Sequence, residues 1–397
     1  MRKFLCLFLS LVLLQSCYVV RAYRFRKFKL EDLSKLKAIS LPANATPFRF
    51  AYDTTRYPKW KKNMDSVLAT THTYAFLVIR GDSILYERYF GEVQQGSLLP
   101  SFSIAKSVTG TLVGIAVHEG KIRSLQEPVT NYLPELRRSD PNFEKVTIQH
   151  LLDMRSGVKS NEDYYNPFSD VLKLGFSANL VKVALKSKTE KEAGTFSYKS
   201  VNTQLLAMIV ERATGMTLQA YAIEKLWQPL QMEQPATWNT DNQNRVRAFC
   251  CINATARDFA RFGRLLMKNG NWQGQQIIPA AWVQQSTSAD TMAAYKGYRN
   301  QWWSKTSYKN FTDSLLAVAF MPQHGVKSGI KRYTSVEGKS SVYTAYYWSG
   351  AFHAEGILNQ VLFVDPARDL IIVRLGHYWK HPQLDAVRFI YNMAGQL

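Results

Sequence analysis

The sequence predicts an α/β (α+β) protein in which one antiparallel sheet is built from both ends of the chain. Three observations support this prediction. Segments with the short apolar or alternating patterns of strands occur near both ends. The middle of the chain is mainly helical, and no internal repeat is present. We therefore expect helices to flank the sheet and a mainly helical subdomain, about residues 121–275, to be inserted between its two halves.

The expected strands are short and separated by turn residues. Near the N-terminus, a hairpin is predicted because Gly81-Asp82 separates two strand-like segments. Near the C-terminus, Pro366 begins a turn between two further segments, and a helix is expected to close the chain at about residues 384–394. The five predicted strands cover residues 74–80, 83–90, 342–348, 358–365 and 370–375.

The expected helices are recognised from their ends. A largely apolar helix follows Ser103 and ends at Gly120, a residue typical of helix C-caps. Thr147 and Thr217 are N-cap candidates for two helices of the middle part. The helix after Thr147 is expected at residues 148–154, and two further helices are expected at residues 201–213 and 256–267.

The composition is that of a folded, exported protein. The chain has 397 residues, 46% of them hydrophobic and 20% charged, with a formal net charge of +20. The basic residues are dispersed and form no long run, so we do not expect nucleic-acid binding.

Residues 1–16 resemble a signal peptide, with a basic start and an apolar core. Leu14-Gln15-Ser16-Cys17 resembles the bacterial lipoprotein box, so Cys17 is expected to carry lipid and residues 17–45 to form a tether before a domain at 46–397. This predicts a bacterial envelope protein anchored to a membrane and facing the periplasm. Cleavage after Ala22, giving a periplasmic secreted protein, and an uncleaved anchor are the alternatives.

The remaining cysteines, Cys250 and Cys251, are neighbours. Because disulfide geometry favours well-separated Cα atoms, we interpret both as buried thiols. The seven histidines are scattered without a metal-binding pattern, and we expect neither a metal nor a cofactor.

The strongest chemical signal is Ser103-Ile104-Ala105-Lys106. A serine and a lysine three residues apart lie on one face of a helix. Of four S-x-x-K matches, only this one opens a long apolar helix. Burial there should lower the pKa of the lysine, and a neutral amine can accept the proton of the serine hydroxyl.

Two other segments complete the predicted site. Tyr198 precedes the helix at residues 201–213, and a nearby ammonium is expected to lower the pKa of its hydroxyl. Gly356 leads into a C-terminal strand, where it permits close backbone approach and lets the Ile357 N–H face a substrate carbonyl.

Together these segments resemble the serine β-lactamase and penicillin-binding-protein-like superfamily, in which S-x-x-K is followed by Y-x-N or Y-x-S. The resemblance spans about residues 74–393 and is closest to the branch of 6-aminohexanoate-dimer hydrolases and esterases. It implies a β-lactamase/transpeptidase-like fold. It also implies that Ser103 is the nucleophile, Lys106 its base and Tyr198 a proton carrier, with Ser200 orienting the lysine.

The resemblance further implies an oxyanion hole made by the Ser103 and Ile357 amides. Tyr164, Tyr165, His353 and Gly356 are candidate substrate-binding residues. Ala354-Glu355-Gly356-Ile357 replaces the K-T-G or H-x-G motif with which penicillin-recognising branches bind a carboxylate.

Three hypotheses follow. The first is a serine hydrolase that cleaves small amides or esters through an acyl-enzyme on Ser103. The second is a D-Ala-directed peptidase or penicillin-binding protein of the cell envelope. The third is a catalytically silent, lipid-anchored binding protein.

Overall fold

The computed structural model describes residues 18–24, 32, 35–53, 61–288, 296–320, 330–334, 341–381 and 384–397. The expected signal peptide and Cys17 lie outside these ranges. Within them, no helix has both the length and the apolar character needed to cross a membrane.

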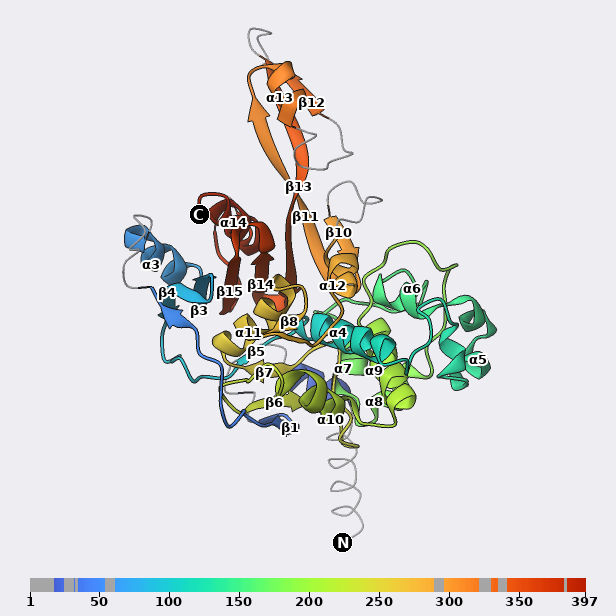
Figure 1. Ribbon diagram of the computed structural model, residues 1–397. Helices are drawn as coiled ribbons and strands as arrows, with labels where there is room; N and C mark the ends of the chain where they lie inside the picture. The colour runs from blue at the N-terminus through green and yellow to red at the C-terminus, as the bar shows by residue number, and fades with distance from the viewer. Residues whose placement is uncertain are drawn as a thin grey trace.

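The dominant element is a nine-stranded sheet in the order β10-β11-β13-β14-β15-β3-β4-β2, with β12 attached to β13 (Figure 1). All its pairings are antiparallel except that between β2 and β4. A second sheet has the order β1-β6-β7-β5, and β8 pairs with β9. The strands are β1 Ala38–Leu41, β2 Ala51–Tyr52, β3 Thr73–Arg80, β4 Ser83–Tyr89, β5 Leu99–Pro100, β6 Ala236–Asn239, β7 Ile252–Ala254, β8 Asn271–Trp272, β9 Gln275–Gln276, β10 Lys296–Arg299, β11 Trp302–Phe311, β12 Ile330–Thr334, β13 Ser341–Gly356, β14 Gln360–Asp365 and β15 Leu370–Gly376.

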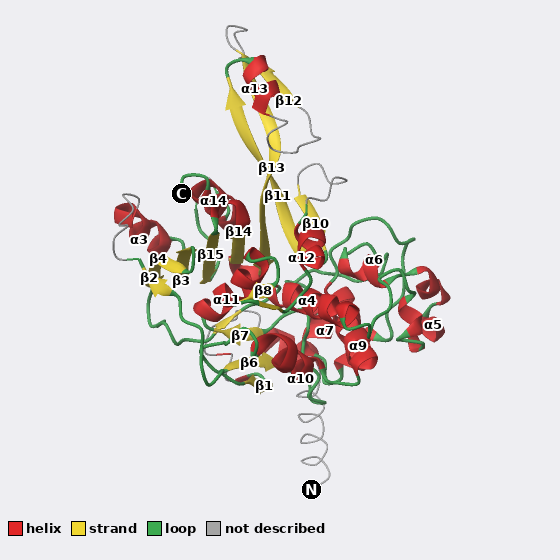
Figure 2. Ribbon diagram, viewed as in Figure 1, coloured by secondary structure: helices red, strands yellow, loops and turns green. Residues whose placement is uncertain are grey.

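The helices lie mainly between the two groups of strands along the chain. Figure 2 distinguishes the helices from the strands by colour. They are α2 Tyr18–Arg24, α3 Lys61–Thr70, α4 Ile104–His118, α5 Glu135–Ser139, α6 Ile148–Leu152, α7 Asp170–Phe176, α8 Leu180–Ala184, α9 Ser200–Thr214, α10 Leu218–Ala222, α11 Ala256–Met267, α12 Ala280–Thr287, α13 Ser314–Phe320 and α14 Ala386–Ala394.

The prediction that both chain ends form one sheet is confirmed. β15 pairs with β3 in antiparallel register, with Ile372 opposite Val78. Both strands are buried along almost their whole length, which requires other elements to pack on both faces of the sheet. Apolar residues of α4 and α11 cover one face, and those of α3 and α14 cover the other.

Helix α11 lies close against the sheet because of Gly263. A Cβ added there would lie 2.9 Å from Leu362 Cδ1 of β14. The sequence of α11 is strongly amphipathic. Its N-cap residue is Thr255, whose hydroxyl oxygen accepts a hydrogen bond from the Asp258 N–H. These contacts fix α11 against β14 and β15 of the large sheet.

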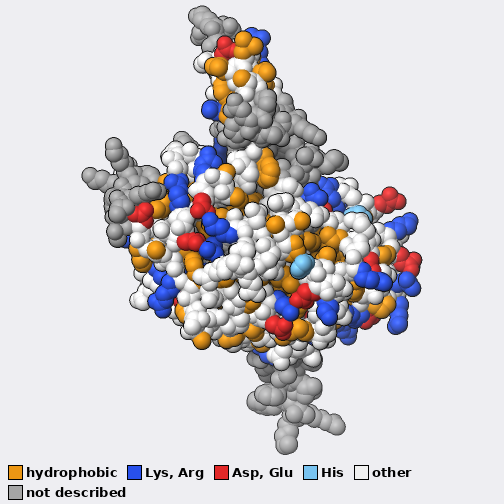
Figure 3. All heavy atoms as spheres, in the orientation of Figure 1, with side chains coloured by type: hydrophobic (Ala, Val, Ile, Leu, Met, Phe, Trp, Pro, Cys, Tyr) orange, Lys and Arg blue, Asp and Glu red, His pale blue; other side chains and the backbone are white. Residues whose placement is uncertain are grey.

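The structure differs from the sequence expectation at two places. Residues 38–41, expected in a tether, form β1, which pairs with β6 and buries Leu41. In addition, β11 and β13 extend well beyond β14 and form an arm with β12 and α13 (Figure 1). Apolar side chains gather near the tip of this arm in Figure 3, where Leu315 and Leu316 are exposed.

Candidate active site

Ser103 lies at the N-cap of α4, just after β5. The preceding turn is fixed by Ser101, whose N–H donates to the Ile252 carbonyl at 2.7 Å and whose hydroxyl oxygen accepts the Ile252 N–H at 3.0 Å. Phe102 has a φ of 41°, a left-handed conformation that costs a bulky residue about 1–3 kcal/mol. The Ser103 side chain makes no capping hydrogen bond, so its hydroxyl remains available for chemistry.

The Lys106 amine contacts the Ser103 hydroxyl. Its Nζ lies 2.9 Å from Ser103 Oγ and 2.9 Å from the Phe249 carbonyl oxygen. Lys106 is 1% exposed. Burial lowers the pKa of its ammonium to about 7, although the Glu162 carboxylate opposes this shift. A large neutral fraction is therefore present near neutral pH, as the sequence predicted.

Tyr198 approaches the same serine from the loop before α9. Its hydroxyl shares a hydrogen bond with Ser103, and the Lys106 ammonium lies 4.9 Å from its ring centre. The expectation of a lowered pKa is wrong. Burial raises the pKa of Tyr198 well above its ordinary value, and nearby Glu162 and Glu355 add to this effect. Tyr198 is consequently a neutral phenol, suited to passing a proton and not to holding a negative charge.

Aromatic side chains from the sheet hold Tyr198 in place. Trp303 of β11 stacks on its ring with a centroid distance of 5.7 Å, and Tyr298 of β10 meets it edge to face at 5.8 Å. Phe196 contacts both of these residues. This wall of the site was not predicted, because Tyr298 and Trp303 are distant from Tyr198 in sequence and carry no motif.

The end of β13 lies against the turn that carries Ser103. A Cβ added at Gly356 would lie 2.5 Å from the Ser101 carbonyl oxygen and 3.0 Å from Ser103 N. Only glycine fits this approach. Ile357 follows and is 39% exposed. In the described part of the chain, neither the Ser103 nor the Ile357 amide donates a hydrogen bond, which leaves both donors for a substrate oxygen.

Ser200 does not orient Lys106. Its hydroxyl lies 3.4 Å from the Tyr164 hydroxyl, and its N–H donates to Glu162 Oε1 at 2.9 Å. The second partner of the lysine is the Phe249 carbonyl, 143 residues farther along the chain. No local pattern marks that carbonyl, because any residue supplies one.

Glu162 is a further residue that sequence reasoning missed. Its carboxylate accepts hydrogen bonds from Ser160 and from the Ser200 amide, and it raises the pKa of Lys106 through its charge. Tyr164, an expected substrate-binding residue, lies in the same network, 3.5 Å from Glu162 Oε2. The available signal for Glu162 was its position, only two residues before Tyr164.

The other expected substrate-binding residues lie apart. Tyr165 is 80% exposed, and its hydroxyl lies 2.6 Å from that of Tyr378. His353 is buried on the α14 side of the sheet, with Nδ1 3.1 Å from the Tyr391 hydroxyl. Since alternate residues of a strand point to opposite faces, Phe352 and Ala354 face α4 whereas His353 does not.

The interpretation of Cys250 and Cys251 as thiols is wrong, because the two form a disulfide. It lies between two parts of the site. The preceding residue, Phe249, supplies the Lys106 acceptor, and the following residue, Ile252, holds Ser101. Among the described residues, no group of three or more His, Cys, Asp or Glu side chains could hold a metal ion.

A family model described as "Beta-lactamase" matches residues 61–394. The chain belongs to the Beta-lactamase family. It is 29% identical over 374 residues to the 6-aminohexanoate-dimer hydrolase of Paenarthrobacter ureafaciens, an alignment that covers 89% of this chain and 85% of that protein. The chain is thus a β-lactamase-fold hydrolase related to this enzyme, as the resemblance indicated.

Solved structures of this family share the fold. One from Bacillus anthracis, which bears the name of a 6-aminohexanoate-dimer hydrolase, has a TM-score of 0.72 at 22% identity and covers 95% of this chain and 93% of its own. A penicillin-binding protein from Bacillus halodurans has a TM-score of 0.61 at 15% identity, with coverages of 84% and 100%. At these identities the likeness shows the fold alone.

Acylation should depend on the neutral form of Lys106. We expect the rate constant for acylation to rise with pH through about 7 and then level off, because the amine loses its proton there. The substitution Lys106→Ala removes this amine and should lower the rate constant for acylation about a hundred- to ten-thousandfold. Stopped-flow acylation with a p-nitrophenyl ester measures both effects, and circular dichroism checks the fold. A flat pH profile in the wild type, or full activity in the variant, would contradict the assignment.

The Cys250–Cys251 disulfide should support the position of the Lys106 acceptor. Its reduction by a dithiol, which leaves two thiols and an oxidised dithiol, is expected to lower acylation about tenfold, since small displacements of reacting groups slow catalysis strongly. The double variant Cys250→Ser/Cys251→Ser should be equally slow and insensitive to the dithiol. An enzyme that keeps its full rate after reduction, with both thiols titrated, would refute this role.

Proposed function

We propose that this protein cleaves small amides or esters through an acyl-enzyme on Ser103. The observation that carries the proposal is the contact between a dehydrated lysine amine and the Ser103 hydroxyl, 2.9 Å apart. The kinship with a 6-aminohexanoate-dimer hydrolase supports amide substrates of modest size.

In the proposed first step, neutral Lys106 accepts the Ser103 proton as Oγ attacks the substrate carbonyl. The carbonyl oxygen becomes negative and receives hydrogen bonds from the Ser103 and Ile357 amides. Each such donor contributes about 3 kcal/mol to stabilising a transition state of this kind. The Tyr198 phenol then donates its proton to the leaving nitrogen or oxygen and regains one from the Lys106 ammonium.

Deacylation follows the same route in reverse. A water molecule takes the position of the leaving group, and its proton passes through Tyr198 to Lys106 as its oxygen attacks the ester. Collapse of the intermediate returns a proton to Ser103 and releases the acid. The raised pKa of Tyr198 suits this role, because a phenol that remains neutral can accept and donate in turn.

A D-Ala-directed peptidase is the second candidate. Such substrates end in a carboxylate, whereas Glu355 lies close enough to Tyr198 for its negative charge to raise that residue's pKa. A carboxylate close to the scissile bond would meet like charge from Glu355 and Glu162, which disfavours substrates whose carboxylate lies beside the bond to be cleaved. The third candidate is a binding protein without catalysis. Binding alone does not require the arrangement of Ser103, Lys106 and Tyr198.

Active-site labelling separates the three candidates. We expect a fluorophosphonate probe to label the wild type and Ser103→Ala to lose all labelling, whereas Ser107→Ala on the same helix keeps it. Labelling is detected on gels and located by peptide mass spectrometry. Stoichiometric labelling by a fluorescent penicillin would favour the peptidase. Absence of any labelling, with acyl transfer also absent from p-nitrophenyl esters, would favour the binding protein.

We also propose that the protein is anchored in a bacterial envelope through lipid on Cys17. The support is the order of a basic start, an apolar core and Leu14-Gln15-Ser16-Cys17. Cells fed a clickable palmitate analogue should incorporate it into the wild type and not into Cys17→Ser. Equal incorporation in both proteins would disprove the anchor, without bearing on Ser103.

A further inference from the structure

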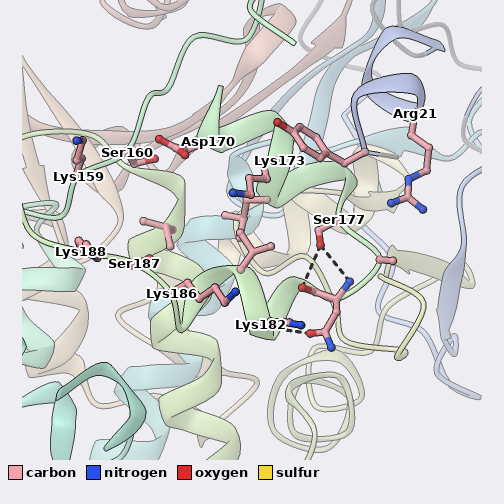
Figure 4. Close-up of a pocket in the computed structure, with 16 residues that line it drawn as sticks. Arg21, Lys159, Ser160, Asp170, Lys173, Ser177, Lys182, Lys186, Ser187 and Lys188 are labelled. Atoms are coloured by element: carbon pink, nitrogen blue, oxygen red, sulfur yellow. Dashed lines mark hydrogen bonds between the residues drawn. The ribbon is translucent and has the colours of Figure 1, made fainter. Parts of the chain in front are cut away.

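A cavity of about 610 Å³ lies among α2, α7 and α8, and Ser103, Lys106 and Tyr198 do not line it (Figure 4). Its walls come from five parts of the chain. They are α2, the segment at residues 159–160, α7 with the turn that follows it, α8 with residues 186–188, and Val201 of α9. A space of this size is within the range of small-molecule sites.

The cavity is strongly basic. Asp170 is the single carboxylate of the lining, and one of its oxygens already accepts the Asn161 N–H at 2.8 Å. Figure 4 shows Lys173, Lys182 and Lys186 around one space with Arg21 across from them. The six cationic residues of the lining are Arg21, Lys159, Lys173, Lys182, Lys186 and Lys188.

These cations lack the carboxylate partners that several other cations of the protein have. Arg212 pairs with Glu135 at 2.6 Å, and Lys225 pairs with Glu119 at 2.8 Å. Over the described ranges, none of the five lysines in the cavity forms such an ion pair. Like charges gathered without partners repel one another, although exposure of the five lysines to solvent keeps this repulsion small, and an anion bound among them would relieve it.

Arg21 provides a second, independent observation. Its Nε is buried and has no hydrogen-bond partner. Leaving a buried donor unsatisfied costs about 1–3 kcal/mol. Its charge also acts on Arg247, whose pKa falls to about 10, mainly through burial, with the Asp241 carboxylate opposing the shift and Arg21 adding to it. An anionic ligand would give the Arg21 Nε an acceptor.

We propose that this cavity binds a phosphate-bearing anionic ligand of the size of a lipid headgroup. Ammonium groups approach the space from α7 and α8 and a guanidinium approaches from α2, an arrangement that suits an anion with more than one charged oxygen. Leu174, Val183 and Val201 also line the walls and can receive an uncharged glycerol or alkyl part.

The position of the cavity fits a ligand from a membrane surface. Tyr18 and Arg21 of its lining belong to the segment that directly follows Cys17. Basic groups beside an anchored terminus are attracted to anionic headgroups, each by about 1 kcal/mol near the surface. The same chemistry would also bind a soluble organic phosphate, so the experiment must distinguish these sources.

Calorimetric titration of the full-length protein in a non-ionic detergent provides the test. The three probes are dihexanoylphosphatidic acid, dihexanoylphosphatidylcholine and inorganic pyrophosphate. We expect saturable binding of an anionic probe that weakens as salt is raised, and none of the zwitterionic lipid. The variant Lys173→Gln/Lys182→Gln/Lys186→Gln should bind the same probe about tenfold more weakly.

A matched variant with the same loss of charge, Lys121→Gln/Lys309→Gln/Lys380→Gln, should bind like the wild type, since these lysines lie outside the cavity lining. Melting temperature and Ser103 acylation confirm that both variants are folded. Binding of phosphatidic acid without pyrophosphate assigns the site to a lipid headgroup, and binding of pyrophosphate assigns it to phosphate itself. If neither anion binds, or if both variants lose affinity equally, the proposal is overturned.

Discussion

The dehydrated contact between Lys106 and Ser103 is the interaction on which the candidate site depends. A lysine in water remains charged at neutral pH and cannot accept a proton from serine. Here α4 is buried for almost its full length, and burial brings the pKa of Lys106 to about 7. The Phe249 carbonyl then satisfies the amine without adding a full negative charge.

The nine-stranded sheet places the remaining groups around that pair. β13 brings Gly356 against the Ser103 turn, and β11 brings Trp303 against Tyr198. These contacts exist because the C-terminal strands join β3 through β15. A single sheet therefore positions the expected Ile357 oxyanion donor, and supports the ring of Tyr198, relative to a nucleophile on another element. This is a common way to hold catalytic groups with little freedom of movement.

Much of the fold could be predicted because its signals are local. The β3–β4 hairpin, the helix after Ser103, the Thr147 cap and the final helix follow from periodicity and end residues. Within the arm, the strand at residues 342–348, a part of β13, was predicted, whereas β11 and its pairing with β13 were not, since these long strands pair far from the core and follow no simple alternation. The pairing of β1 with β6 was missed because a four-residue strand in a basic segment resembles a tether.

By itself, the sequence predicted which groups would carry the proposed chemistry: a serine and a lysine one helical turn apart, a tyrosine before a helix and a glycine before a strand. Helical geometry fixes the first pair without any tertiary contact. Only the tertiary structure decided their protonation and their partners. Tyr198 has a raised pKa, Lys106 bonds to Phe249 instead of Ser200, and His353 faces away. Burial and long-range contacts set these properties, and neither can be seen in the spacing of residues along a chain.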